Sequence, residues 1–377
     1  MTTSAATGTH TIPTQAYCTL EHFNHELDSL FPHTWLFACL KLELEGKHHY
    51  GLRLGATEIL LQIDDQGLPR AFLNVCTHRH AKLCDPGQHK GPIRCPYHSW
   101  VFNRQGIPTG IPQKTAFPHV VVAPEKYRLK EFPCEIVGQF IFVRLSSQGQ
   151  DLREYLGHQY DFLERASDGM NKVLDEFQEN VDANWKVVIE NSLEGYHVPA
   201  VHNRTFGQVE GMSQEADAPI FFLEDRLHSH LEHAANSEWV NRFSRMEKKI
   251  GKWPWRFEHY THRLIFPNLT VTSFMGYSFH IQRFDPLSTD LTKVHSRTVG
   301  VEFSNGTLTG EKIMERIHTD GHDFTRKVFL EDGEICRKVQ AGISQTARPA
   351  TFGNGIEDRV KHFHGAYLSQ TPALRKP

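Results

Sequence analysis

The sequence predicts an α+β protein in which a small all-β module precedes a larger domain that has an antiparallel sheet covered by helices. Short apolar segments broken by Gly, Pro and Asp occupy residues 35–145. Helices with charged faces and longer strands occupy residues 146–377. A chain of 377 residues is also long for one hydrophobic core, so two domains are expected.

Residues 1–34 are expected to form an N-terminal helical segment that packs on the larger domain. Leu20, Phe23 and Leu27 are spaced as on one face of a helix. The pattern changes toward a strand at Trp35, where the β module is expected to begin.

The β module contains four segments typical of short strands, TEILLQID, AFLNV, SWVFN and QFIFVRL. Turns are predicted at residues 65–67 and 104–106, each ending in Gly. Two pairs of Cys and His lie directly after AFLNV and directly before SWVFN. Loops that carry these pairs would therefore leave the sheet at one end.

The larger domain is expected to begin with helices in DLREYLGHQYDFLERA and ANWKVVIENSLEGYHV. Strands are predicted in RLIFPNLTVTSF, SFHIQRFDPL and KVHSRTVGVEF, followed by a helix around VFLEDGEICRKVQAG. The segment RLHSHLEHAA contains His228, His230, Glu232 and His233 at a spacing that matches no metal motif, so it is interpreted as a solvated helix.

Composition excludes several classes of partner. The formal net charge is −3, which argues against electrostatic binding of nucleic acid or anionic lipid. No run of eighteen apolar residues and no signal pattern occur, so a cytoplasmic protein without a membrane partner is expected. No dinucleotide-binding or P-loop motif is present, and reducing equivalents would have to come from another protein.

The two Cys–His pairs form the first candidate metal site. Cys76-x-His78 and Cys95-x-x-His98 are individually common by chance, but their occurrence together in this order is rare. Thiolates bind iron and sulfide, and imidazoles on one iron of a 2Fe–2S cluster raise its reduction potential. A structural zinc site with the same four ligands is the alternative, although C-x-H is a short spacing for zinc.

A second candidate site is expected where a helix ends. Glu194 and His197 would lie on one stripe of a helix, and Pro199 would break that helix so that His202 turns back toward His197. Asp332 interrupts an otherwise apolar helical stripe that includes Cys336 and Val339. A buried carboxylate needs a cation, and two histidines with one carboxylate form a triad that binds Fe(II) with open positions.

These motifs together resemble those of the Rieske non-haem iron oxygenases, in particular the alpha subunits of aromatic ring-hydroxylating dioxygenases. The resemblance covers nearly the whole chain and implies a Rieske domain at residues 35–145 and a helix-grip catalytic domain at residues 146–377. It implies that Cys76, His78, Cys95 and His98 bind the 2Fe–2S cluster and that His197, His202 and Asp332 bind the mononuclear iron. Glu194 would connect His197 to His98 of the partner subunit in a homotrimer. His80 departs from the family pattern, in which Gly is usual.

The resemblance also implies the activity of a terminal oxygenase. NADH would supply electrons through a separate reductase, possibly with a ferredoxin, and dioxygen would be the co-substrate. An aromatic or cyclic substrate, as in aromatic hydrocarbon catabolism, is favoured. The alternative is monooxygenation or demethylation of a quaternary ammonium or methylated compound, toward which Glu194 points because many aromatic dioxygenases carry Asp there. A protein that only transfers electrons is the less favoured alternative.

Overall fold

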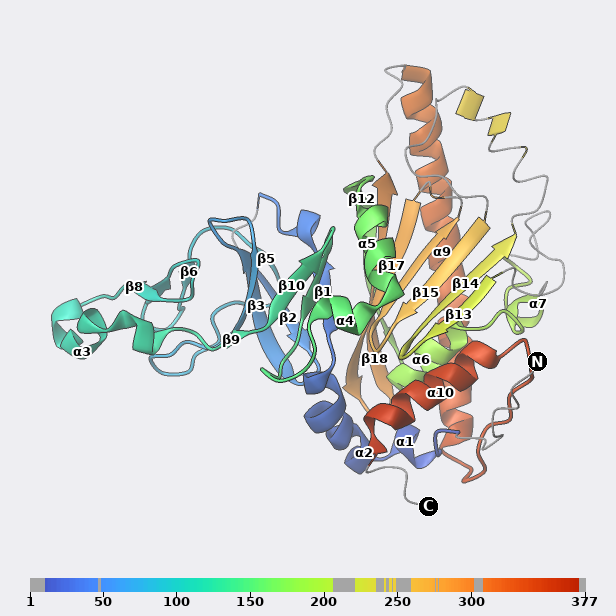
Figure 1. Cartoon of the computed structure of the whole chain (residues 1–377), viewed down its shortest axis with the longest axis horizontal. Coiled ribbons are helices and arrows are strands. Elements are labelled where there is room, and N and C mark those ends of the chain that lie inside the picture. The colour runs from blue at the N-terminus through green and yellow to red at the C-terminus, as the bar shows by residue number, and fades with distance from the viewer. Residues whose placement is uncertain are drawn as a thin grey trace. The chain divides into compact units, whose positions relative to one another are not determined.

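The structure is a computed structural model that describes residues 11–46, 49–205, 221–234, 241, 244–245, 247–248, 259–274, 276, 278–301 and 308–372. The chain forms two compact units (Figure 1). One unit comprises residues 27–173, and the other comprises residues 1–26 and 174–377. The predicted domain borders at residues 34 and 145 stay a prediction. None of the described helices is both long and apolar enough to cross a membrane.

The unit at residues 27–173 is built from three small antiparallel sheets. One contains β1 (Leu36–Leu40), β11 (Phe140–Val143) and β10 (Cys134–Val137), in that order. The second has the order β5 (Gly87–His89), β2 (His49–Leu54), β3 (Thr57–Ile63), β4 (Pro69–Leu73) and β9 (Glu131–Phe132). The third contains β6 (Ile93–Arg94), β7 (Val101–Phe102) and β8 (Pro108–Gly110). The predicted all-β module is therefore present.

Both predicted turns form by the same mechanism. Asp64 Oδ1 accepts hydrogen bonds from the backbone N–H groups of Gln66 and Leu68, at 2.9 and 3.0 Å. Asn103 Oδ1 likewise accepts hydrogen bonds from the backbone N–H groups of Gln105 and Ile107. Each turn needs one residue at positive φ, which Gly67 and Gly106 supply.

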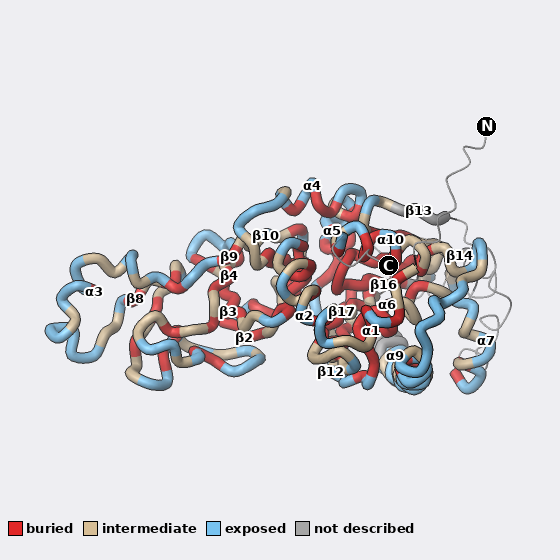
Figure 2. Tube along the Cα trace, turned by 90° about the horizontal axis from the view of Figure 1, so that it is seen from below, coloured by how far each residue is buried: buried red, intermediate tan, exposed pale blue. Residues whose placement is uncertain are grey.

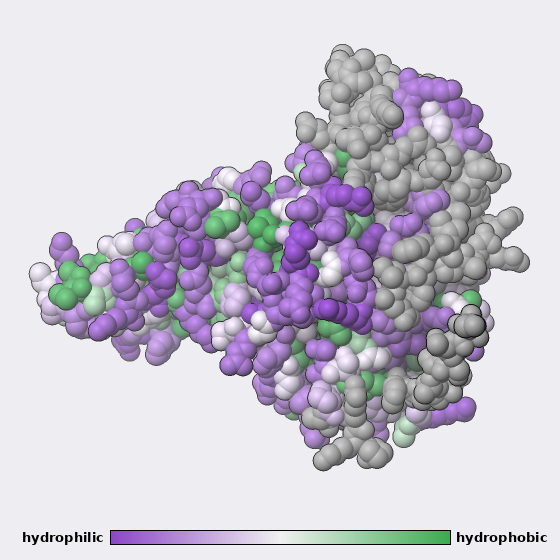
Figure 3. All heavy atoms as spheres, in the orientation of Figure 1, coloured by the Kyte–Doolittle hydropathy of each residue, from purple (hydrophilic) through white to green (hydrophobic). Residues whose placement is uncertain are grey.

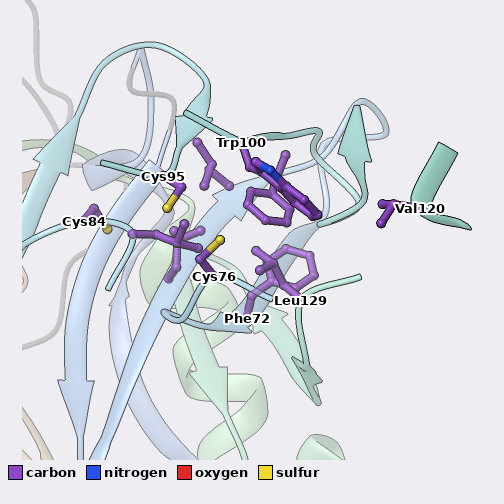
Figure 4. Packing of buried hydrophobic residues seen from close by; sticks show 11 residues of the cluster. Phe72, Cys76, Cys84, Cys95, Trp100, Val120 and Leu129 are labelled. Atoms are coloured by element: carbon purple, nitrogen blue, oxygen red, sulfur yellow. The ribbon is translucent and has the colours of Figure 1, made fainter. Parts of the chain in front are cut away.

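Short helices complete this unit. They are α3 (Pro118–Val122), α4 (Leu152–Leu156) and α5 (His158–Ser167). Val121 and Val122 of α3 are exposed, and the face in Figure 3 is mostly hydrophilic with small hydrophobic groups. Figure 4 shows the buried cluster at the loop end of the sheets, where Cys76 and Cys95 lie among Phe72, Trp100 and Leu129.

The other unit contains one long antiparallel sheet, as predicted (Figure 1). Its order is β12 (Met170–Val181), β18 (Leu291–Val301), β17 (Ser278–Ser288), β16 (Leu269–Phe274), β15 (His259–Ile265), β14 (His228–Ala234) and β13 (Phe221–Asp225). The predicted strand RLIFPNLTVTSF is two strands, because residues 266–268 form a turn that contains the cis Phe266–Pro267 bond. Buried residues are concentrated on the strands (Figure 2).

Helices pack on this sheet, which confirms the predicted α+β class. The N-terminal segment begins with α1 (Gln15–Cys18) and α2 (Leu20–His25), which continues into helical turns at Glu26–Leu30 and Phe31–His33. α6 (Trp185–Ser192) contacts β17, β18 and α9 (Leu308–Ile343), and α10 (Asp358–Gln370) contacts β14. The short α7 (Val198–Val201) follows α6.

The prediction of a solvated helix at RLHSHLEHAA is wrong. Residues 228–234 form β14, which pairs with β13 and β15. His228 and His230 are buried, and the Nδ1 atom of His228 accepts a hydrogen bond from Phe266 N. Polar side chains that alternate along a strand can be buried when neighbouring strands supply hydrogen bonds, and hydropathy alone does not reveal this.

Two expectations about helix faces are also wrong. α6 ends at Ser192, so Glu194 and His197 lie in the turn after it and not on a helical stripe. The hydroxyl of Ser192 donates to the carbonyl of Ile189 in the last turn, which is typical of a side chain that competes with helix continuation. In α9, Val339 is 42% exposed and does not join the core.

α6 is anchored at its start by a fully buried ion pair. Lys186 Nζ lies 2.5 Å from Glu26 Oε1, and both side chains are 0% exposed. Trp185 Nε1 and the hydroxyl of Tyr367 donate to the same carboxylate, at 2.8 and 2.7 Å. The ion pair therefore connects the N-terminal helix, α6 and α10, and its remaining lone pairs are satisfied.

We expect Lys186→Met to lower the free energy of unfolding by about 3–5 kcal/mol, because it leaves the Glu26 charge buried without its cation. Chemical denaturation would measure this change. The double variant Glu26→Gln with Lys186→Met should lose less free energy of unfolding than Lys186→Met alone. Arg326→Gln, which breaks the half-exposed pair with Asp175, is the control and should cost about 1 kcal/mol or less. A loss below 1 kcal/mol for Lys186→Met would contradict the anchoring role.

Candidate metal centres

The first centre lies at the ends of two matching loops in the β module. Cys76 and Cys95 are 0% and 1% exposed, and burial, with the neighbouring Cys95 thiol, raises the pKa of Cys76. In each loop the residue four positions after the Cys donates its backbone N–H back to the carbonyl of that Cys, from His80 and Ser99, both at 3.0 Å. The loops thus bring the two thiols together without a disulfide bond.

The two histidines of this centre meet in the same place. The rings of His78 and His98 have centroids 4.7 Å apart. The Nδ1 atom of each ring is buried and has no hydrogen-bond partner among the described residues. Burial, with the charge of His98, lowers the pKa of His78, which favours its neutral form. Two adjacent thiols and two unpartnered imidazole nitrogens fit a 2Fe–2S cluster with mixed ligands.

Aromatic side chains pack against these half-buried imidazoles. The indole of Trp100 stacks on His78 with a centroid distance of 4.7 Å and an interplanar angle of 4°. Phe117 contacts the rings of His78 and Trp100 edge-on, and the ring centroids of Tyr97 and His98 are 3.7 Å apart. Such a shell limits the access of water, one of the factors that set the potential of an iron–sulfur cluster.

The second centre combines residues from α9 and from the turns that flank α7. His197, His202 and Asp332 each offer one ligand atom, and these atoms lie within 4.8 Å of one another. The Nε2 atom of His202 is 3.1 Å from Asp332 Oδ1, and that of His197 is 3.5 Å from the same oxygen. Pro199 does not break α6 but lies in the first turn of α7, and the ring centroids of His197 and His202 are 5.2 Å apart, as close as expected.

A second carboxylate orients each histidine of this triad. Glu194 Oε1 is 2.5 Å from His197 Nδ1, and its other oxygen accepts from the backbone N–H of His197. Glu331 Oε2 is 2.8 Å from His202 Nδ1 and also accepts from the hydroxyl of Thr205, at 2.6 Å. A carboxylate at Nδ1 fixes the proton there and leaves the Nε2 lone pair free for a metal.

The charges of the triad are closely coupled. Burial alone would lower the pKa of His197, but its bonds to Asp332 and Glu194 raise it to about 9. Burial likewise would raise the pKa of Asp332, but hydrogen bonds from His197, His202 and Asn191 hold it below its usual value. The negative charge that produces these shifts is also what binds a divalent cation.

Three polar residues around the triad were not identified as site residues from the sequence. They are Glu331, Thr205 and Asn191, whose side-chain amide donates to Asp332 Oδ1 at 2.8 Å. The only sequence signals are the Glu-Asp pair at residues 331–332 and the Glu-Asn pair at residues 190–191. Asn191 and Asp332 line a small cavity with Gln282, Phe284 and Phe329.

Two protein-family models match the chain. Residues 150–373 match the model described as "Ring hydroxylating alpha subunit (catalytic domain)". Residues 34–133 match the model described as "Rieske [2Fe-2S] domain". The first match spans the triad and the second spans the four Cys and His residues.

Curated relatives align along most of the chain. Choline monooxygenase of Amaranthus tricolor is 26% identical over 96% of this chain and 77% of its own length. The oxygenase subunit of carnitine monooxygenase from Escherichia coli K12 is 25% identical over 94% of this chain and 92% of its own length. Naphthalene 1,2-dioxygenase from Rhodococcus sp., bound to indole, shares the fold with a TM-score of 0.77 at 18% identity, covering 97% of this chain and 95% of its own.

The first prediction for the site concerns Glu331. Glu331→Ala should weaken binding of Co(II), used as a probe of the triad, by about 10- to 100-fold, because His202 loses the carboxylate that orients it. Titration of the visible Co(II) absorption would measure this. Glu334→Ala, on the same helix but exposed, is the matched control. Equal affinity in both variants would contradict the orienting role.

The second prediction concerns His80, which has a φ of 59° in the left-handed region. Gly tolerates this conformation better, so His80→Gly should stabilise the loop by about 1 kcal/mol. Ser99 has a φ of 58° at the equivalent position of the other loop, and Ser99→Gly should act similarly. Thermal unfolding of both variants tests this, and a lower midpoint in each would contradict it.

Proposed function

This chain belongs to the ring-hydroxylating alpha-subunit family of Rieske oxygenases, and from that premise we propose which residues act and on what class of substrate. Members of this family are oxidoreductases that use dioxygen. A 2Fe–2S cluster held by the β module would supply single electrons, and an iron held by the triad would supply the chemistry that activates dioxygen. The observation that carries the proposal is the convergence of His197, His202 and Asp332.

The proposed ligands follow from the two donor sets. Cys76 and Cys95 would bind one iron of the cluster through their thiolates, and His78 and His98 would bind the other through Nδ1. The unpartnered Nδ1 atoms support this assignment. His197 and His202 would bind the mononuclear iron through Nε2, with Asp332 as the third ligand. Their Nδ1 protons would stay with Glu194 and Glu331, so the chain holds both imidazoles in one tautomer.

Electron supply is proposed to involve other chains. Glu194 is the candidate link between His197 and His98 of the partner subunit in a homotrimer. NADH would be oxidised by a separate reductase, with or without a ferredoxin, because the sequence has no dinucleotide-binding motif. The predicted cytoplasmic location stays a prediction.

The proposed reaction is monooxygenation or demethylation of a quaternary ammonium or methylated compound. The choline and carnitine monooxygenases match nearly the whole chain, and Glu194 is the residue that pointed to this class in the sequence. Phe284 and Phe329 beside Asp332 offer aromatic faces, to which methylated ammonium groups are attracted. The aromatic or cyclic substrate class stays the alternative.

The mononuclear assignment predicts the behaviour of His202→Ala. This variant should keep the visible absorption and electron paramagnetic resonance of the cluster, since His202 lies in the other compact unit of the chain. Substrate-dependent oxygen uptake with a surrogate reductase should fall by at least about 100-fold. Retained turnover in this variant would overturn the assignment.

The substrate class is tested by oxygen uptake and product analysis with a surrogate reductase and NADH. Betaines, choline and carnitine should stimulate oxygen uptake and yield aldehyde products, in amounts that match the oxygen consumed. Naphthalene and benzoate form the comparison set. Stimulation by these alone, with hydroxylated ring products, would establish the alternative instead.

A further inference from the structure

A buried arginine in the catalytic unit has no acidic partner among the residues that the structure describes. Arg359, in the first turn of α10, is 4% exposed. Its Nε atom donates to Ser229 Oγ at 3.2 Å, and its Nη2 atom donates to His262 Nδ1 at 3.0 Å. Its Nη1 atom is buried without a hydrogen-bond partner among the described residues. Within the described part of the chain, the guanidinium is therefore held in place by neutral groups, and no carboxylate balances its charge.

This situation is energetically unfavourable, as a second buried arginine shows by contrast. Arg283 is 1% exposed and binds both carboxylate oxygens of Asp285, at 2.8 to 3.1 Å. Burial lowers the pKa of Arg359 to about 10. His262 cannot compensate the charge. Its Nδ1 atom accepts from Arg359 and therefore carries a lone pair, so the imidazole is neutral. An anion from outside the described residues would supply the negative charge that balances Arg359.

Arg359 lies on the face of the sheet that also faces the triad. Its partner His262 pairs across the sheet with Thr272, and Thr272 pairs with His280. Residues two positions apart on a strand share a face, so Gln282 lies on the face of His280. Gln282 lines the cavity that includes Asp332. One continuous polar face thus runs from Asp332 to Arg359.

Tyr260 belongs to the same face. It lies two residues before His262 on β15, so both side chains share the face. Burial is the main cause that raises the pKa of Tyr260 to about 12. The charge of Arg359 lowers the pKa of Tyr260, and the charge of Asp332 raises it, so both charges act on the same phenol.

We propose that Arg359, positioned by Ser229 and His262, binds a carboxylate group of the substrate while the carbon to be oxidised lies at the triad. A carboxylate carries one negative charge, which matches one guanidinium among neutral imidazoles and hydroxyls. A phosphate dianion would leave an excess charge buried. This inference rests on the proposed function and narrows the substrate to a compound that carries a carboxylate, such as a betaine. Choline, which has no carboxylate, would then be a poorer substrate.

The first test needs no ligand. Arg359→Gln should not lower the thermal midpoint of the holoenzyme, because it removes an unbalanced buried charge. Arg283→Gln is the matched control and should lower the midpoint, because it leaves Asp285 without its cation. An equal fall in both variants would show that Arg359 is only a structural residue and would overturn the proposal.

The second test uses four small compounds that separate the two functional groups. Glycine betaine carries a trimethylammonium and a carboxylate, and choline replaces the carboxylate with an alcohol. The compounds 3,3-dimethylbutyrate and 3,3-dimethylbutanol replace the nitrogen of each by carbon. Titration calorimetry gives a dissociation constant for each compound with the wild type, Arg359→Lys and Arg359→Gln.

We expect the wild type to bind each carboxylate about 10- to 100-fold more tightly than its alcohol partner. Arg359→Gln should abolish that preference without weakening the alcohols, and Arg359→Lys should restore part of it. An unchanged preference in Arg359→Gln would overturn the carboxylate site. Equal binding of the nitrogen and carbon compounds would instead contradict the proposed ammonium substrate and leave the result for Arg359 intact. Failure of both carboxylates to bind the wild type would also overturn the carboxylate site.

Discussion

Transfer of an ionised side chain from water to the interior costs several kcal/mol unless it meets an opposite charge, a metal or enough hydrogen bonds. That constraint explains the polar interior of the catalytic unit. Glu26 is buried because Lys186, Trp185 and Tyr367 satisfy it. Asp332 is largely buried because His197 and His202 face it, an arrangement that a cation completes.

α6 connects these two arrangements. Its first turn carries Trp185 and Lys186, which bind Glu26, and its last turn carries Asn191, which donates to Asp332. A helix fixed at both ends places the following turn, with Glu194, at a constant position relative to α9. The buried ion pair thus contributes to the geometry of the metal centre although it touches none of the proposed ligands.

The residues that meet at the two candidate centres could be found in the sequence, because they depend on short spacings or on one buried charge. Two Cys–His pairs on loops and an Asp in an apolar helical stripe are visible without knowledge of the fold. Features that depend on distant pairing were missed. The partnership of Glu331 with His202 joins residues far apart in the chain, and His228 is buried only because β13 and β15 flank its strand. Arg359 gave no signal, since an isolated arginine on a polar helix is ordinarily solvated.

The central claim is that one polypeptide binds two iron centres of different chemistry, in separate compact units. Iron and acid-labile sulfide, measured per chain in anaerobically reconstituted protein, test it most directly. We expect about three irons and two sulfides per chain, two irons for the cluster and one for the triad. A content of two irons and two sulfides after reconstitution with excess Fe(II) would contradict the claim, because the triad would then bind no metal.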